Sequence, residues 1–210
     1  MENNWAAENL QTIRTIMERS ALYRRALAPI MILAGTIGTL AGLAGYFLKL
    51  DSARSFPIYW MSVAVVAIVG ALLLVRRQAL KDAEPFWSSP TRRVTSALMP
   101  PLFIGLFFGV GAIVLFADDG AEERFILAIV WVLLYGCALH SAGFSMPRGI
   151  KLFGWGFIIG GCSLLAVLFS DVLPMINSVP PHLLMGFFFG VTHLAYGAYL
   201  YFTEPRKTEA

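Results

Sequence analysis

Charged residues are scarce in this chain. Asp, Glu, Lys and Arg make up 14% of its 210 residues, whereas a typical soluble domain contains about 25%. Apolar residues make up 58%, and the mean hydropathy is +0.70. A soluble globule of this size could not bury so much apolar surface, and disordered chains are far less apolar. The composition therefore predicts an integral membrane protein.

Cysteine is almost absent as well, and two residues in the whole chain exclude a secreted fold held together by disulfides. The spans contain no pair of carboxylates for acid–base catalysis, and the chain has no glycine-rich phosphate loop. Gly143-Phe144-Ser145 resembles the start of the Gly-x-Ser-Gly motif of rhomboid proteases, but the second glycine is missing. Ser145 also lies too far in depth from His193 for that histidine to activate it. We therefore expect no enzyme activity.

Six long segments contain no Asp, Glu, Lys, Arg, Asn or Gln. Each is close to the roughly 20 apolar residues that a helix needs to cross a bilayer, and none shows the alternation typical of a membrane barrel. We predict an all-α polytopic protein with a cytoplasmic amphipathic segment (1–26), a six-helix transmembrane domain (27–202) and a cytoplasmic tail (203–210). The expected spans are Leu27–Leu48, Ile58–Val75, Ala97–Phe116, Phe125–Phe144, Leu152–Phe169 and Leu183–Phe202.

Proline is absent from the middle of every predicted span. Five of the eleven prolines stand at or just before span starts, where the missing N–H costs nothing, so mostly unbroken helices are expected. Ser89 and Pro90 form a helix-start signal, so the third span should begin early and bend near Pro100. The loop before it, residues 76–96, is predicted to be the longest connection.

Lys and Arg are distributed unequally between the two sides of the predicted bundle. Thirteen lie in the N-terminal segment, the second and fourth loops and the tail, against three in the other loops. Positively charged loops stay in the cytoplasm, so both termini are predicted to be cytoplasmic. Orientation thus explains the net charge of +3, and no nucleic-acid binding is expected.

Residues 5–25 are predicted to form an amphipathic helix, because Leu10, Ile13 and Met17 recur at spacings of three and four. Such a helix can lie in the cytoplasmic interface of the membrane. It can also contact a protein partner, as can the loop over residues 76–96. The sequence leaves an oligomer open.

Glycines recur at helical spacing in four of the predicted spans: the first, third, fifth and sixth. Small residues let helices approach closely in a membrane, where apolar burial drives little association between helices. These stripes are therefore predicted to face inward and to pack helices together. The longest consist of Gly35, Gly38, Gly42 and Gly45 in the first span and Gly186, Gly190 and Gly197 in the sixth.

Two histidines, His140 and His193, each stand between glycines at spacings of three and four. At about 100° per residue, each set falls within about 60° of one helix face. Both side chains are therefore predicted to point into the bundle. A polar group buried in a membrane needs a partner and is a candidate functional residue.

Four interpretations of these histidines stay open. Each can hydrogen-bond a hydroxyl on a neighbouring helix, with Tyr135 and Tyr196 among the candidate partners, or both can line a path for a solute or protons. Either can ligate haem, although a height offset of about 7 Å argues against a shared haem. His193 can also join Cys137 and Cys162 around zinc or copper, although we expect these cysteines to be reduced, packed thiols.

The chain opens with Glu8-Asn9-Leu10, Ile13-Arg14 and Met17-Glu18-Arg19-Ser20, and its sixth span closes with His193-Leu194-Ala195-Tyr196-Gly197. With the six spans between them, these short motifs resemble a group of bacterial membrane proteins without an assigned activity. The resemblance implies a bacterial cytoplasmic membrane, and it carries no functional residue across.

The expected function is that of a non-enzymatic membrane component, such as a scaffold, an accessory subunit or a sensor, in contact with the lipid bilayer. The absence of intramembrane charge and of broken helices favours this interpretation. One alternative is a small-solute transporter or channel whose path is lined by His140 and His193. Another is a haem- or metal-binding membrane protein. No cofactor and no metal site is predicted, and haem stays an alternative.

Overall fold

A computed structural model describes residues 21–83, 85–115, 121–146, 148–169 and 179–203. These residues are overwhelmingly helical and contain no strand, which confirms the all-α prediction. The amphipathic helix predicted over residues 5–25 lies almost wholly outside the described residues, and so does the tail from residue 204 onward.

Six helical stretches are long and apolar enough to cross a membrane, as predicted. The first five are single helices, and the sixth consists of three consecutive pieces. The elements are α2 (Ala21–Phe47), α3 (Ser55–Lys81), α4 (Ser89–Leu115), α5 (Ala121–Ala142), α6 (Arg148–Leu168), α8 (Pro181–Met185), the π-helical segment η1 (Gly186–Val191) and α9 (Thr192–Thr203).

The connection between the second and third spans is shorter than predicted. Helix α3 continues to Lys81, and α4 begins at Ser89, as the helix-start signal indicated. Residues 82–88, rather than 76–96, therefore connect the two helices. Helix α3 continues past the apolar run because its buried stripe also continues, as far as Ala79, which is 1% exposed.

The sixth span is not the unbroken α-helix that was expected. In η1 the hydrogen bonds are wider, and the N–H of Thr192 donates to the carbonyl of Phe187, five residues earlier. Single wide turns of this kind occur inside α-helices, often at functional sites. Within η1, Gly186 and Gly190 lie against the backbone of α2. The wide turn therefore coincides with a contact between helices and not with a proline.

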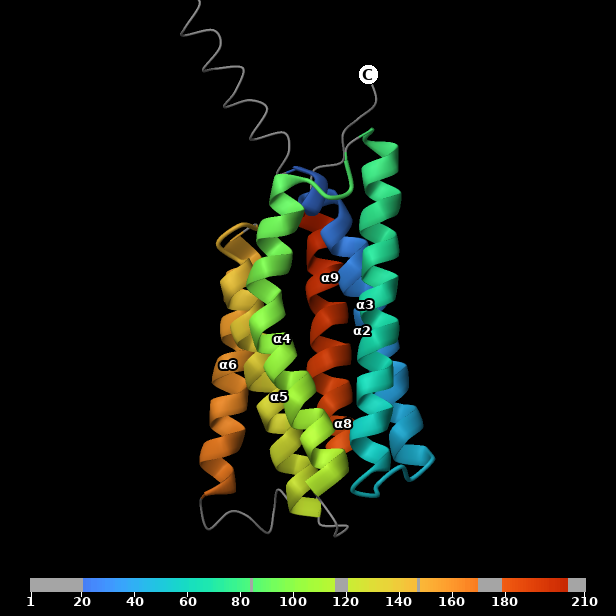
Figure 1. Cartoon of the computed structure of the whole chain (residues 1–210), viewed down its shortest axis with the longest axis vertical. Helices are drawn as coiled ribbons and strands as arrows, with labels where there is room; N and C mark the ends of the chain where they lie inside the picture. Colours follow the sequence, from blue (N-terminus) through green and yellow to red (C-terminus); the bar gives the residue numbers. More distant parts are fainter. Residues whose placement is uncertain (1–20, 84, 116–120, 147, 170–178, 204–210) are drawn as a thin grey trace, which may run out of the picture.

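The spans form an inner and an outer group (Figure 1). In α5, 50% of the most apolar stretch is buried inside the molecule, and the shares in α2 and the sixth span are 44% and 39%. In α3, α4 and α6 the shares are only 11%, 17% and 22%. The inner group carries the core, and the outer helices present most of their apolar side chains outward.

Two large clusters of buried side chains fill most of this core. One contains Phe56 and Met185 and lies toward the end where α3 begins. The other contains Leu27 and Phe157 and extends toward the opposite end, where α2 begins. Helix α5 contributes to both clusters, as expected for the most deeply buried helix.

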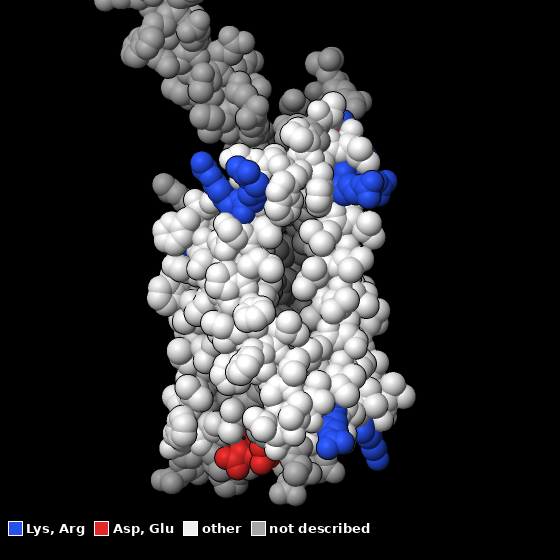
Figure 2. Space-filling view, in the orientation of Figure 1, with Lys and Arg blue, Asp and Glu red and all other residues white. Residues whose placement is uncertain are grey.

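Charged side chains gather at the two ends of the bundle, and the face between them is uncharged (Figure 2). Lys and Arg lie at the end where α3 finishes and α4 begins, and others lie at the opposite end. Acidic side chains lie at the opposite end, where the first turn of α5 carries Glu122 and Glu123. The height of the uncharged face is that of the six apolar helices, as expected for a protein surrounded by lipid.

Candidate functional site

The glycine stripe of α2 lies directly against the sixth span. A Cβ added at Gly42 would lie 2.6 Å from the Cα of Gly186, and one added at Gly35 would lie 2.5 Å from the backbone nitrogen of Leu194. Real Cβ atoms essentially never approach so closely, so the two segments meet backbone to backbone, as small residues permit in a membrane. The other predicted packing glycines are equally enclosed: Gly38, Gly45, Gly190 and Gly197.

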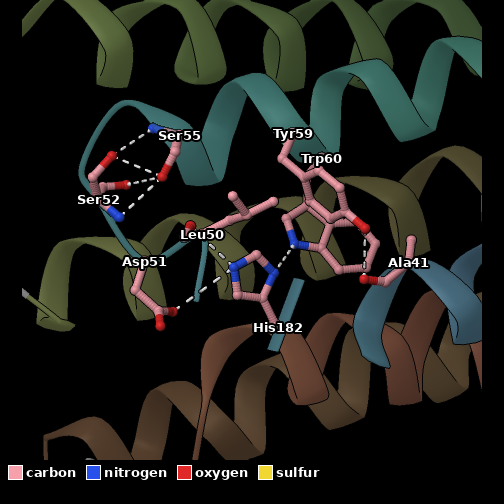
Figure 3. Close-up of polar contacts among 8 residues, drawn as sticks. All are labelled: Ala41, Leu50, Asp51, Ser52, Ser55, Tyr59, Trp60 and His182. Atoms are coloured by element: carbon pink, nitrogen blue, oxygen red, sulfur yellow. Dashed lines mark hydrogen bonds and ion pairs between the residues drawn. The ribbon is translucent and has the colours of Figure 1, made fainter. Parts of the chain in front are cut away.

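The last glycine of this stripe makes room for a histidine that the sequence analysis did not single out. His182 lies in the first turn of α8 and is 0% exposed. Its ring fills the space that a side chain on Gly45 would need. Figure 3 shows the ring pointing toward the start of α3 and the segment that joins α2 to α3. Three separate parts of the chain therefore meet at this one side chain.

Both ring nitrogens of His182 are bonded within the chain. The indole N–H of Trp60 donates to Nδ1 over 3.1 Å, and Nε2 lies 3.1 Å from the carbonyl oxygen of Leu50 (Figure 3). An indole N–H can only donate and a carbonyl oxygen can only accept. Nδ1 therefore carries no proton, and Nε2 carries the proton that it donates to Leu50. His182 is the neutral ring in this arrangement.

Aromatic side chains surround His182. The ring centres of Phe56 and Tyr59 lie 5.0 Å and 5.6 Å from its own. The Tyr59 hydroxyl donates to the carbonyl of Ala41 over 2.8 Å, which ties α3 to α2 beside the same site. The carboxylate of Asp51, a half-exposed side chain, lies 3.8 Å from Nε2 at the edge of the cluster. The cluster is thus a joint between helix ends.

His193 makes a comparable pair of bonds deeper in the bundle. It is 1% exposed, its Nδ1 lies 3.1 Å from the carbonyl oxygen of Phe188, and its Nε2 lies 2.8 Å from the hydroxyl oxygen of Tyr135. The carbonyl only accepts, so Nδ1 carries a proton. In the neutral ring, Nε2 accepts the hydrogen bond from Tyr135. The expected bond to a neighbouring helix is present, and its partner is on α5.

The surroundings of His193 do not fit a haem ligand. An axial ligand needs a free ring nitrogen, whereas both nitrogens here are bonded. Phe153 and Phe157 of α6 close the ring off, with ring centres 5.1 Å and 5.5 Å away. Tyr196, a candidate partner in the sequence analysis, stacks on Phe153 with ring centres 4.6 Å apart. Aromatic packing fills the space around this imidazole.

His140 lies in a separate place. It is half-buried on α5, and its ring centre lies 5.6 Å from that of Phe144 and 5.3 Å from that of Trp155. Its Nδ1 is buried without a hydrogen-bond partner among the described residues. None of the described aromatic rings that pack on His140 also packs on His193, so the structure does not bring the two predicted site residues into one cluster.

Cys137 and Cys162 are exposed on the outside of the bundle, so the prediction of packed thiols is wrong. The reason is local, because Gly136 and Gly161 occupy the positions where α5 and α6 touch. The residue after each glycine is therefore turned away from the contact. The two thiols cannot share a metal ion with the buried His193, and the described part of the chain contains no group of three or more possible metal ligands.

A spacing in the sequence could have revealed His182. It stands four residues before Gly186, so it extends the stripe of the sixth span by one turn. It lies just outside the apolar run that defines the predicted span, however. Its partners Leu50 and Trp60 come from distant parts of the chain, and no local pattern connects them.

No family model, no curated protein and no solved structure matches this chain. The function must therefore be argued from the geometry. In that geometry the sixth span is the common attachment point: His182 joins it to α3 and to the α2–α3 connection, and His193 joins it to α5. Chemically, the two buried imidazoles act as bridges that hold helices in place.

Proposed function

We propose that this chain is a non-enzymatic scaffold or accessory subunit of a bacterial cytoplasmic membrane. One observation carries the proposal: both fully buried histidines, His182 and His193, direct their ring nitrogens to partners within the chain. A ring whose nitrogens are both bonded in this way has none left for a substrate or a metal. Its contribution is to fix the helices around it.

The outer helices support the same proposal. Val65 on α3 is 60% exposed, and Phe103 and Phe107 on α4 are 67% and 70% exposed. Contiguous apolar surfaces of this kind mark contacts with lipid or with another protein. An inner group joined backbone to backbone, with apolar outer helices around it, suits a subunit that holds partners in the membrane.

The transport alternative finds less support. It requires His140 and His193 to line one path, but each packs among its own aromatic side chains. Such a path also needs polar groups that are free to contact a solute. The Tyr135 hydroxyl beside His193 is already bonded to the histidine ring. Neither ring offers the continuous polar route that a solute needs.

One experiment separates the two roles. We expect the variant His193→Gln to change the phenotype of a strain only as far as it lowers the amount and melting temperature of the folded protein. If His193 lined a path, the phenotype of the gene deletion would appear while amount and melting temperature stayed normal. That second result would contradict the scaffold proposal. Tyr199→Phe, at a residue that is 59% exposed, is the control.

The proposed orientation has its own test. Thirteen of the sixteen Lys and Arg residues lie on the side that we assign to the cytoplasm. Reporter fusions that follow residues 50, 120 and 178 should therefore read as external, and a fusion after residue 84 should read as cytoplasmic. A cytoplasmic signal at residue 120 would overturn the orientation.

A further inference from the structure

Two of the three outer helices, α3 and α4, touch each other near the start of α3 and the end of α4 but separate in the middle. On α3, one stripe at helical spacing runs Met61, Ala64, Ile68, Ala71, Val75 and Ala79. Met61 contacts α4, since its Sδ lies 2.7 Å from the place of a Cβ on Gly109. Val75 and Ala79 are buried at the other end, whereas Ala64 and Ile68 between them are exposed. The middle of this stripe is therefore uncovered.

Helix α4 turns its inward stripe to α5, where Val94 packs with Ala142 and Gly105 lies against Trp131. The uncovered middle of α3 is therefore not covered by this stripe of α4. Figure 2, in the orientation of Figure 1, shows a hollow between the side chains that cover α4 and those that cover α3. We call this hollow the α3–α4 groove.

Positive charge surrounds one end of the α3–α4 groove. Arg76 and Arg77 follow Val75 directly on α3, and Arg92 and Arg93 stand directly before Val94 on α4. All four arginines are exposed, and Figure 2 shows Lys and Arg on both sides of the upper end of the hollow. Neither α3 nor α4 contains an acidic residue. The described acidic residue nearby is Asp82, which accepts a hydrogen bond from Gln78.

We propose that the α3–α4 groove binds an anionic phospholipid, with one acyl chain between the helices and the phosphate against Arg76 and Arg92. The uncovered middle is apolar and narrow, which suits a hydrocarbon chain. Arginine forms paired hydrogen bonds with phosphate oxygens, and basic residues at the cytoplasmic surface attract anionic lipids. The inference rests on membrane insertion and the proposed orientation, and it does not require the scaffold role.

The charge arm of the test uses the full chain purified in a mild detergent. Retained lipid is measured by native mass spectrometry during titration with phosphatidylglycerol or phosphatidylcholine. We expect tighter binding of phosphatidylglycerol, and about 30-fold weaker binding in the variant Arg76→Gln/Arg92→Gln, at about a factor of five or six for each charge. The control Lys49→Gln/Arg54→Gln removes two charges at the opposite end and should leave binding unchanged.

The chain arm tests the hydrocarbon contact. Ala64→Phe should fill the groove and displace phosphatidylglycerol, whereas Ala195→Phe, at an exposed residue of α9, should not. Soluble glycerol phosphate, which lacks acyl chains, should neither bind nor compete. The exposed arginine variants keep the test decisive even if Ala64→Phe does not fold.

Three results would overturn the proposal. They are equal binding of the two lipids, unchanged binding in the arginine variant, and a second protein in the groove in place of lipid. The last would be detected by a photo-crosslinking residue at Ile68 that yields a stoichiometric protein adduct and no lipid adduct.

Discussion

The inner and outer helices of this protein are joined in different ways. Helix α2 meets the sixth span through backbone, with Gly42 and Gly186 face to face. Helices α3 and α4 touch through single side chains such as Met61 and leave a groove between them. Lipid tails are as apolar as leucine, so close backbone approach holds membrane helices together more firmly than apolar side chains do. The inner joint should therefore tolerate much less change than the outer one.

The largest effect is expected at the inner joint. In Gly42→Leu, the new Cβ would lie 2.6 Å from the Cα of Gly186. That neighbour is backbone, which cannot move aside as a side chain can. We expect more than about 3 kcal/mol of destabilisation and no folded protein in membrane extracts. The yield of monodisperse protein in size-exclusion chromatography is the measurement.

The control is Gly111→Leu on α4, where a Cβ would meet nothing within 4 Å. Its yield and melting temperature should stay close to those of the unmodified protein. Loss of folded protein in both leucine variants would mean that the contact between Gly42 and Gly186 is not the cause of the effect.

A smaller effect is expected where α3 is tied to the inner group. Trp60→Phe keeps an aromatic ring, but it removes the N–H that donates to Nδ1 of His182 and leaves a smaller side chain at a buried position. A buried acceptor left without a donor costs about 1–3 kcal/mol, so the melting temperature in detergent should fall. Trp87→Phe, at a residue that is 58% exposed, is the control and should change little. An unchanged melting temperature for Trp60→Phe would show that the bond contributes nothing to stability.

Within the inner group, Tyr135→Phe removes the hydroxyl that bonds to Nε2 of His193. Hydrogen bonds between membrane helices are worth about 0.6 kcal/mol on average and up to about 1.7 kcal/mol. We therefore expect a loss within that range, measured by denaturation in mixed micelles. A double variant with His193→Gln should lose less than the sum of the single losses, because both remove the same bond. Full additivity would mean that the two side chains act independently.

The smallest effect is expected on the outer surface. Cys137→Ser and Cys162→Ser change exposed side chains and should alter stability by less than about 0.5 kcal/mol. Both thiols should also react with a small maleimide in folded, detergent-solubilised protein, as mass spectrometry would show. Protection of either thiol until unfolding would mean that this face is covered.

Much of the fold is predictable because membrane insertion limits what a sequence can do. Long runs without charge identify the six helices, and glycines at spacings of three and four identify the face of α2 that packs. These signals are local, and each can be found in a window of about 20 residues. The same reasoning misplaced the start of the second connection, because the helix continues through Arg76 and Arg77, which an apolar run excludes.

The site was less predictable because its contacts connect distant residues. Trp60 and His182 are 122 positions apart, and Leu50 and His182 are 132 apart. No local spacing relates these residues to one another. A histidine that follows two prolines also suggests a loop rather than a buried site. His193 was recognised from its stripe, but its partner Tyr135 was one of several hydroxyls at suitable depth. The tertiary packing determines which of these hydroxyls bonds to His193.

The π-helical segment η1 lies between His182 and His193 and changes the angle between the directions in which the two rings point. His193 follows His182 by eleven positions. In a regular α-helix, eleven positions turn through about 1,100°, so both rings would point within about 20° of one direction. Instead one ring points to α3 and the other to α5. The segment therefore sets the angle between the two rings. Deleting one residue from it would leave ten positions between the histidines, which turn through about 1,000° in a regular α-helix, so the rings would still point about 80° apart.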